Sequence, residues 1–214
     1  MAYFITFEGI EGCGKSTQAK ILSRELQTET GCQVVATREP GGCAIADKIR
    51  TILLDAENNA LVPLAELLLY AAARAQHVAE VIKPALADGK IVLCDRFTDA
   101  TTAYQGHGRS LDLALIEYLA QLATGGLTPD LTILLDCPEE VGIKRAMARI
   151  NATSGDREER FEQESLHFHH AVREGYLKLA ADHPGRFIII DGTLGIAETA
   201  AAIRKAVFSR IPRG

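Results

Sequence analysis

Apolar residues along the 214-residue chain follow two alternating patterns. Short runs rich in Val, Ile, Leu and Phe predict strands, and longer stretches with apolar residues three or four apart predict helices. The expected strands cover residues 3–7, 33–37, 91–94, 131–135 and 187–190. The expected helices cover residues 16–30, 44–54, 63–87, 112–123, 139–150 and 196–208, and a polar segment follows residue 94.

Strands that alternate with helices predict right-handed βαβ units, and hence a parallel sheet with helices on both faces. The runs at 91–94, 131–135 and 187–190 are apolar throughout, as expected for parallel strands buried on both sides. We therefore predict an α/β fold with a five-stranded parallel sheet, formed by one domain over residues 1–214. A polar, charged stretch between two helices predicts a short lid at about residues 150–161.

The first chemical signal lies between the first strand and the first helix. Residues 9–16 read Gly-Ile-Glu-Gly-Cys-Gly-Lys-Ser and fit the phosphate-binding P-loop, G-x-x-x-x-G-K-[ST]. Glycines let consecutive N–H groups turn toward phosphate oxygens, and the helix N-terminus adds positive partial charge. We expect Lys15 to reach the phosphates of ATP and the Ser16 hydroxyl to bind Mg²⁺. The alternative is a glycine-rich turn without a ligand.

The composition of the chain limits the kinds of partner and the cellular location that we expect. The net charge of −5 gives no general cationic field, so neither nucleic acid nor a membrane surface is an expected partner. The cysteines number five, an odd count, and no two have C-x-x-C spacing, so we expect no disulfide framework and a reducing, cytoplasmic location. No apolar run approaches the roughly 20 residues that a membrane span needs.

Three classes of P-loop protein remain: GTPase switches, phosphotransferases acting on small substrates, and nucleotide-driven binding or motor proteins. The chain has no N-K-x-D guanine motif and is short for a motor. A second set of candidate anion and base contacts favours a phosphotransferase. Asp95 and Arg96 follow the third strand, where they could bind Mg²⁺ and phosphate or merely fix a loop. Tyr70 and Arg74 share a helix face and could hold a base, or be a buried Tyr with a surface Arg.

Several segments taken together resemble the thymidylate kinases, the P-loop enzymes that phosphorylate dTMP to dTDP. The segments are FEGIEGCGKST at 7–17, TREPGG at 37–42, YAAAR at 70–74, DRF at 95–97, AYQG at 103–106 and RFE at 160–162. The resemblance covers nearly the whole chain and implies ATP as the phosphoryl donor, dTMP as the acceptor and Mg²⁺ as the cofactor. It also implies a homodimer formed by helices on one side of the sheet.

The resemblance implies a role for each matching residue. The implied ATP contacts are Gly9, Ile10, Glu11, Gly12, Cys13, Gly14, Lys15, Ser16, Thr17 and, on the adenine side, Arg149. The implied dTMP contacts are Glu11, Arg38, Glu39, Pro40, Arg50, Tyr70, Arg74, Arg96, Thr101, Tyr104 and Gln105. Among these, Arg38, Arg50 and Arg96 hold the phosphate, Tyr70 stacks on thymine, Arg74 donates to its O4, and Tyr104 lies under the deoxyribose. The implied metal ligands are Ser16, Asp95 and Glu11.

Two departures from the family pattern shape the expected mechanism. Gly12 stands where some members carry a basic residue, so the implied catalytic arginine moves to the lid, with Arg160 favoured over Arg157, beside Lys15 and Arg96. Ala100 stands where members often have Ser, which removes one expected hydrogen bond to the base. Another nucleoside monophosphate kinase stays open as an alternative, as does a deoxynucleoside kinase with Glu11 or Asp95 as its base.

The stretch His167-Phe168-His169-His170 suggests a metal site at first sight. Its helical pattern, however, places Phe161, Phe168, Val172, Tyr176 and Leu179 on the buried face, with the histidines mostly beside it. We therefore expect these histidines on a partly exposed helix surface.

Overall fold

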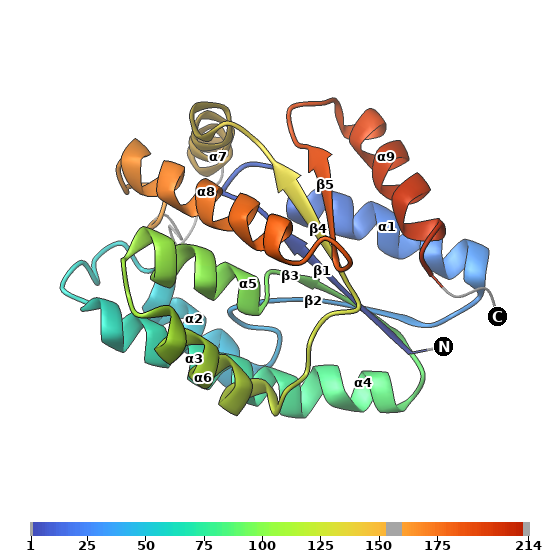
Figure 1. Ribbon diagram of the computed structural model, residues 1–214, viewed down its shortest axis with the longest axis horizontal. Helices are drawn as coiled ribbons and strands as arrows, with labels where there is room; N and C mark the ends of the chain where they lie inside the picture. Colours follow the sequence, from blue (N-terminus) through green and yellow to red (C-terminus); the bar gives the residue numbers. More distant parts are fainter. Residues whose placement is uncertain (1, 153–159, 212–214) are drawn as a thin grey trace.

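The computed structural model describes residues 2–152 and 160–211 (Figure 1). Five parallel strands form one sheet in the order β2-β3-β1-β4-β5. The strands are β1 Tyr3–Glu8, β2 Val34–Arg38, β3 Ile91–Asp95, β4 Leu131–Asp136 and β5 Phe187–Asp191. This confirms the predicted α/β class and the predicted number and direction of strands, each within about one residue of its expected bounds.

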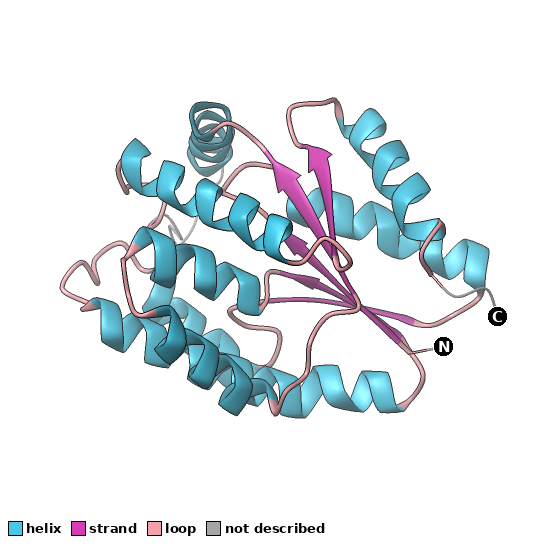
Figure 2. Ribbon diagram, viewed as in Figure 1, coloured by secondary structure: helices cyan, strands magenta, loops and turns pink. Residues whose placement is uncertain are grey.

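Helices cover both faces of the sheet (Figure 2). They are α1 Lys15–Thr30, α2 Ala44–Leu54, α3 Pro63–His77, α4 Lys83–Ala87, α5 Thr98–Thr101, α6 Leu113–Thr124, α7 Glu139–Ala152, α8 Leu166–Asp182 and α9 Ile196–Phe208, with π-helical segments at Val78–Ile82 and Thr102–Gly108. On β1, Ile5 and Phe7 pack toward α1 and α9, whereas Phe4 packs against Val78 and Ile82 on the other face. Alternate residues of a strand point to opposite faces, so a strand buried on both sides is mostly apolar, and the polar residues of β1, Thr6 and Glu8, are buried with hydrogen-bond partners.

One predicted helix is more complex than its pattern indicates, and another helical stretch was missed. The helix expected over 63–87 is α3, the π-helical segment and α4, which follow one another without a break. The segment after β3, which was expected only to be polar and for which no helix was predicted, is helical over α5 and Thr102–Gly108. Its polar residues Asp99, Thr101 and Gln105 are buried because they make specific hydrogen bonds, so the stretch lacks an apolar period.

Two glycines allow α7 to lie against the P-loop. A Cβ on Gly12, whose φ is +69°, would overlap the Gly142 carbonyl oxygen. A Cβ on Gly142 would lie 2.5 Å from the Glu11 carbonyl oxygen and 2.8 Å from Ile10 Cδ1. The absence of a basic side chain at position 12 therefore has a steric cause, because no side chain fits there without displacing α7.

We predict that Gly142→Ala destabilises the protein and raises the KM for ATP. Alanine ordinarily stabilises a helix interior by about 0.5–1 kcal/mol relative to glycine, so a loss of stability must come from the clash with the P-loop backbone. Thermal unfolding and steady-state kinetics would measure both effects. Gly185→Ala is the matched control, because nothing lies within 4 Å of its Cβ position. A Gly142→Ala protein as stable as this control would contradict the prediction.

Candidate active site

The P-loop spans the end of β1 and the first turn of α1. Gly9, Gly12 and Gly14 all have positive φ, so these three glycines turn the loop as predicted. Lys15 begins α1, and its ammonium group donates to the carbonyl oxygens of Gly9 at 3.1 Å and Ile10 at 2.7 Å. The N–H groups of the first helical turn have no partner within the helix, and they face the region where phosphates are expected.

A hydroxyl and a carboxylate meet beside this loop. The Ser16 hydroxyl donates to Asp95 Oδ2, and Asp95 ends the strand that pairs with β1. The sequence predicted these two residues as metal ligands, and the structure brings them together. Glu11, the third predicted ligand, points its Oε1 to Arg96 at 2.8 Å and to the Tyr104 hydroxyl at 2.6 Å.

Arg96 is the most connected side chain of the site. Its backbone has a φ of +71°, a left-handed conformation that is strained for a residue with a Cβ. One terminal nitrogen donates to the Gly9 carbonyl at 2.9 Å and to the Tyr176 hydroxyl at 3.0 Å, and the other to Glu11 and to the Tyr104 hydroxyl. These bonds hold the guanidinium between the P-loop and the helices on one face of the sheet.

The Glu11 carboxylate is ionised because of its neighbours. Burial alone would raise its pKa, but Arg96 and, with smaller effects, His169, Lys15 and Tyr104 lower the pKa of Glu11 to about 2. The site therefore holds a fixed negative charge next to its central cation at neutral pH.

A cavity of about 360 Å³ opens from the P-loop toward α3, a size typical of small-ligand sites. Most of its lining residues are those that the sequence analysis assigned to ATP, dTMP or metal, namely Glu11, Gly12, Lys15, Ser16, Arg38, Glu39, Pro40, Arg50, Tyr70, Arg74, Asp95, Arg96, Thr101, Tyr104, Gln105 and Arg149. Leu54, Phe97, Ala100, Ile150, Phe161 and Glu162 complete the lining. The remaining P-loop residues Gly9, Ile10, Cys13, Gly14 and Thr17 lie outside it.

Arg74 reaches the far end of the cavity and is not a surface residue. It donates to Glu39 Oε2 at 2.7 Å, and to the Phe97 carbonyl and the Thr101 hydroxyl, each at 3.0 Å. Tyr70 lines the same end, 6.5 Å from the Phe161 ring. Arg38 and Arg50 line the wall between this end and the P-loop, where Arg50 donates to the Pro40 carbonyl at 2.9 Å.

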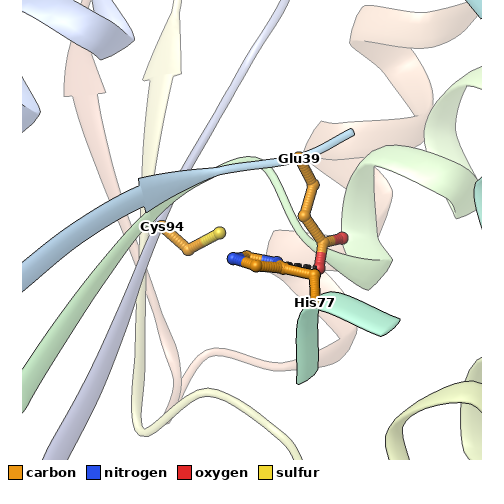
Figure 3. A group of neighbouring side chains, drawn as sticks. All are labelled: Glu39, His77 and Cys94. Atoms are coloured by element: carbon orange, nitrogen blue, oxygen red, sulfur yellow. Dashed lines mark hydrogen bonds and ion pairs between the residues drawn. The ribbon is translucent and has the colours of Figure 1, made fainter. Parts of the chain in front are cut away.

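Beneath the cavity, Glu39, His77 and Cys94 come close enough together to suggest a metal site (Figure 3). Their polar atoms already have partners. His77 Nδ1 lies 2.9 Å from Glu39 Oε1, its Nε2 lies 2.6 Å from the Thr37 hydroxyl, and the Cys94 thiol donates to the Arg96 carbonyl. The cluster is therefore a buried hydrogen-bond network that fixes Glu39, and through it Arg74.

The three arginines in and beside the predicted lid differ in where they lie. Arg149 lines the cavity and lies 3.5 Å from Glu162. The Arg160 guanidinium is buried away from the cavity, where it donates to the Leu53 carbonyl at 2.6 Å and to Glu66. Arg157 lies outside the described residues. The structure thus brings Lys15 and Arg96 together, but not Arg160.

Three residues of the site were missed by the sequence analysis or were placed wrongly. His167 and His170 are exposed as expected, but the prediction was wrong for His169, which is completely buried. Glu66 is buried and accepts hydrogen bonds from Gln105 and Arg160. Glu8 is buried and accepts from the Phe97 N–H at 2.7 Å and the Tyr176 hydroxyl at 2.9 Å. Of these three residues, only Glu8 had a signal in the sequence, because it directly precedes the P-loop.

A parallel sheet with a P-loop, a serine–aspartate pair and an arginine-lined cavity defines a P-loop phosphotransferase that acts on a phosphorylated small acceptor. Comparison with known proteins names the family. The sequence profile of the family "Thymidylate kinase" matches residues 7–203. The chain belongs to the thymidylate kinase family, and it transfers the γ-phosphoryl group of ATP to dTMP to give dTDP.

Comparison with individual relatives gives the same family. The chain is 66% identical over 214 residues to the thymidylate kinase of Geotalea uraniireducens, with 100% of both chains covered. It is 64% identical over 213 residues to that of Geobacter sulfurreducens, again with full coverage of both. The crystal structure of thymidylate kinase from Ehrlichia chaffeensis is similar with a TM-score of 0.76 and 34% identity, covering 96% of this chain and 98% of that one.

The buried Glu8 predicts a pH dependence of stability. Burial, and secondly Asp99, raise the pKa of Glu8 to about 8 against the opposing effect of Arg96. The unfolded chain loses this proton near pH 4.5, whereas the folded chain keeps it until about pH 8, so stability falls as the pH rises through this window. Glu8→Gln cannot ionise and should remove this component. As the pH rises from 5 to 8, the Tm of Glu8→Gln should therefore rise relative to the Tm of the unchanged protein.

Thermal unfolding of both proteins across this pH range would measure the effect. The control is Glu174→Gln, since Glu174 is exposed on α8. If the Tm of Glu8→Gln follows that of the unchanged protein in parallel at every pH, the assignment of a raised pKa to Glu8 is wrong.

Proposed function

We propose that Mg²⁺ assists this thymidylate kinase and that Ser16 and Asp95 hold it. A hydroxyl and a carboxylate oxygen side by side are hard oxygen donors, which suit Mg²⁺ together with water and phosphate oxygens. When bound, the ion would neutralise charge on the β- and γ-phosphates. We propose Glu11 as an outer neighbour of this site, since its Oε1 is already bonded to Arg96.

We propose that the P-loop, residues 9–16, holds the ATP phosphates together with Thr17, and that Arg149 flanks the adenine. Lys15 has the reach for the β- and γ-phosphates, because it presently donates to loop carbonyls around the expected phosphate position. The other residues of this segment contribute backbone N–H donors and the shape of the loop; they are Gly9, Ile10, Gly12, Cys13, Gly14 and Thr17.

We propose that dTMP occupies the cavity with its phosphate toward Arg96 and its base toward Arg74. Arg38 and Arg50 add positive charge on the phosphate side, while Glu39 and Pro40 form the wall. Tyr70 offers a ring to the thymine, and Thr101 and Gln105 border it. Tyr104 closes the sugar position beside Arg96. Ala100 supplies no hydrogen bond, so the Thr101 hydroxyl is the neighbouring polar group.

Transfer then needs positioning and charge neutralisation more than covalent chemistry by the protein. The phosphate of dTMP is already largely anionic and requires no general base. Lys15 and Arg96 flank the transferring group, and we propose a lid arginine, Arg160 or Arg157, as the third cation. An Arg160 that takes this role must leave Glu66. Residues 153–159 of the lid predicted at about 150–161 lie outside the described part of the chain; we propose for this lid the role of excluding water and so suppressing hydrolysis of ATP.

The single observation that carries these roles is that Lys15, Arg96 and the Ser16–Asp95 pair line one cavity. We predict that Lys15→Ala and Arg96→Ala each lower kcat at least about 10²-fold, which corresponds to a few kcal/mol of transition-state stabilisation. ADP release with dTMP as acceptor measures this, and Lys20→Ala on the exposed side of α1 serves as the control. Near-normal turnover in both variants would refute the assignment.

We propose that the enzyme is a homodimer, as the family resemblance implies, and that α2, α3 and α6 form its interface. These helices pack against one another and carry exposed apolar side chains, namely Ile45, Ile52, Leu64, Leu68, Leu115, Tyr118 and Leu122. Leu64 and Leu68 share one face of α3, and Tyr118 and Leu122 share one face of α6. A second copy would cover these exposed apolar side chains.

We predict that Leu68→Glu combined with Leu122→Glu converts the dimer to a monomer, because four charges would be buried at a two-fold interface without partners. Analytical ultracentrifugation would give the mass in solution. Ile196→Glu is the control, since Ile196 is also exposed but lies on α9 across the sheet. A dimer that persists with both substitutions would place the interface elsewhere.

None of the helices in the described part of the chain is both long and apolar enough to cross a membrane. We propose a cytoplasmic location, where ATP and dTMP are found, and the five cysteines are all unpaired, in keeping with a reducing compartment.

A further inference from the structure

His169 and Glu11 form an unusual buried contact. His169 Nδ1 lies 3.4 Å from Glu11 Oε2, within ion-pair distance but without a hydrogen bond. Neither ring nitrogen of His169 has a hydrogen-bond partner among the described residues, and Glu11 Oε2 has none either. Buried polar atoms are nearly always paired, so three unpaired atoms at one place in an active site call for an explanation.

The hydrogen bonds that Arg96 already makes offer an explanation for these unpaired atoms. Each terminal nitrogen of a guanidinium carries two hydrogens. One nitrogen uses both on Gly9 and Tyr176, and the other uses both on Glu11 and Tyr104. To bind an acceptor phosphate through its terminal nitrogens, Arg96 must therefore release a present partner. Glu11 is the partner that a phosphate most directly competes with, because both are anions.

A Glu11 carboxylate released from Arg96 would be a buried charge without a partner, which is costly. His169 lies where it can prevent this, since its Nδ1 is adjacent to Glu11 Oε2, the carboxylate oxygen that is not bonded to Arg96. A neutral imidazole with its hydrogen on Nδ1 is a sufficient donor. The Phe168 ring packs edge-on at 5.5 Å and holds the imidazole in place.

We propose that His169 is a positioning residue, which receives the Glu11 carboxylate when the phosphate of dTMP takes its place on Arg96. The inference rests on the proposed role of Arg96 in holding that phosphate. It assigns His169 no contact with substrate. Its effect reaches the reaction through Glu11 alone, and it should concern dTMP rather than ATP.

A matched pair of variants tests this. His169→Asn keeps a donor near the position of Nδ1, whereas His169→Leu has nearly the same shape without one. Steady-state kinetics would give kcat and KM for each substrate. We expect His169→Leu to lower kcat/KM for dTMP about tenfold, with KM for ATP within about twofold, and His169→Asn to recover most of the loss. His170→Asn, the exposed neighbour, should behave as the unchanged protein.

The same substitutions in a Glu11→Gln background separate positioning from folding. If His169 acts through the Glu11 carboxylate, His169→Leu should have little further effect once that carboxylate is gone. An equal loss in both backgrounds would overturn the proposal, as would unchanged kinetics of His169→Leu or equal kinetics of the Asn and Leu variants. If the His169→Leu protein fails to fold, the Asn variant remains: His169→Asn must then match the unchanged protein when Glu11 is present and match Glu11→Gln alone when it is not, and a loss in either background would overturn the proposal.

If Arg96 does not hold the phosphate of dTMP, the kinetics would show a different pattern. In that case Arg96→Lys would keep the KM for dTMP of the unchanged protein. Failure of the inference about His169 alone would leave Arg96→Lys impaired toward dTMP while His169→Leu behaves normally.

Discussion

The ion pair between Glu11 and Arg96 is the interaction on which the site depends. β1 and β3 pair in parallel, with Phe7 opposite Asp95, so the loops that follow both strands leave the sheet at the same edge. The Arg96 N–H donates to the Phe7 carbonyl at 2.9 Å, and its side chain continues to Gly9 and Glu11. The end of β3, which carries Asp95, is thereby locked to the P-loop. The left-handed backbone of Arg96 is the local cost of this arrangement, which several hydrogen bonds offset.

The same interaction explains how one end of the sheet can serve two anionic substrates. Arg96 lies between the P-loop, where ATP is expected, and the cavity that extends toward α3. Tyr104 and Tyr176 contact it from the helical side through their hydroxyl groups. An arginine held from two sides cannot swing into solvent, so its charge is in place before substrate arrives. Such preorganisation is what makes electrostatic catalysis effective, because little reorganisation is needed during the reaction.

The sequence predicted what depends on local pattern. Strand and helix periods, the glycines of the P-loop and the Ser16–Asp95 pair all follow from residue type and spacing, and the fold agrees with them. What it missed depends on distant partners. Nothing near His169 along the chain shows that Glu11 lies beside it, and Glu66 is buried only because Gln105 and Arg160 come to it from other segments. The helical stretch after β3 was missed for the same reason, since its buried polar residues give no apolar period.

Buried acids also resolve an apparent conflict between the charge of the chain and that of its substrates. The protein has a net charge of −5, yet it must bind two polyanions. Three arginines are each held by a largely buried glutamate: Arg96 by Glu11 and Arg74 by Glu39 at the cavity, and Arg160 by Glu66 away from it. Each pair is nearly neutral when seen from a distance, so long-range attraction is weak. At contact distance, however, a phosphate or a base carbonyl can take the place of a present partner, and the fixed geometry of the arginine still recognises it. Selectivity then comes from fit within the cavity rather than from a general attraction for anions.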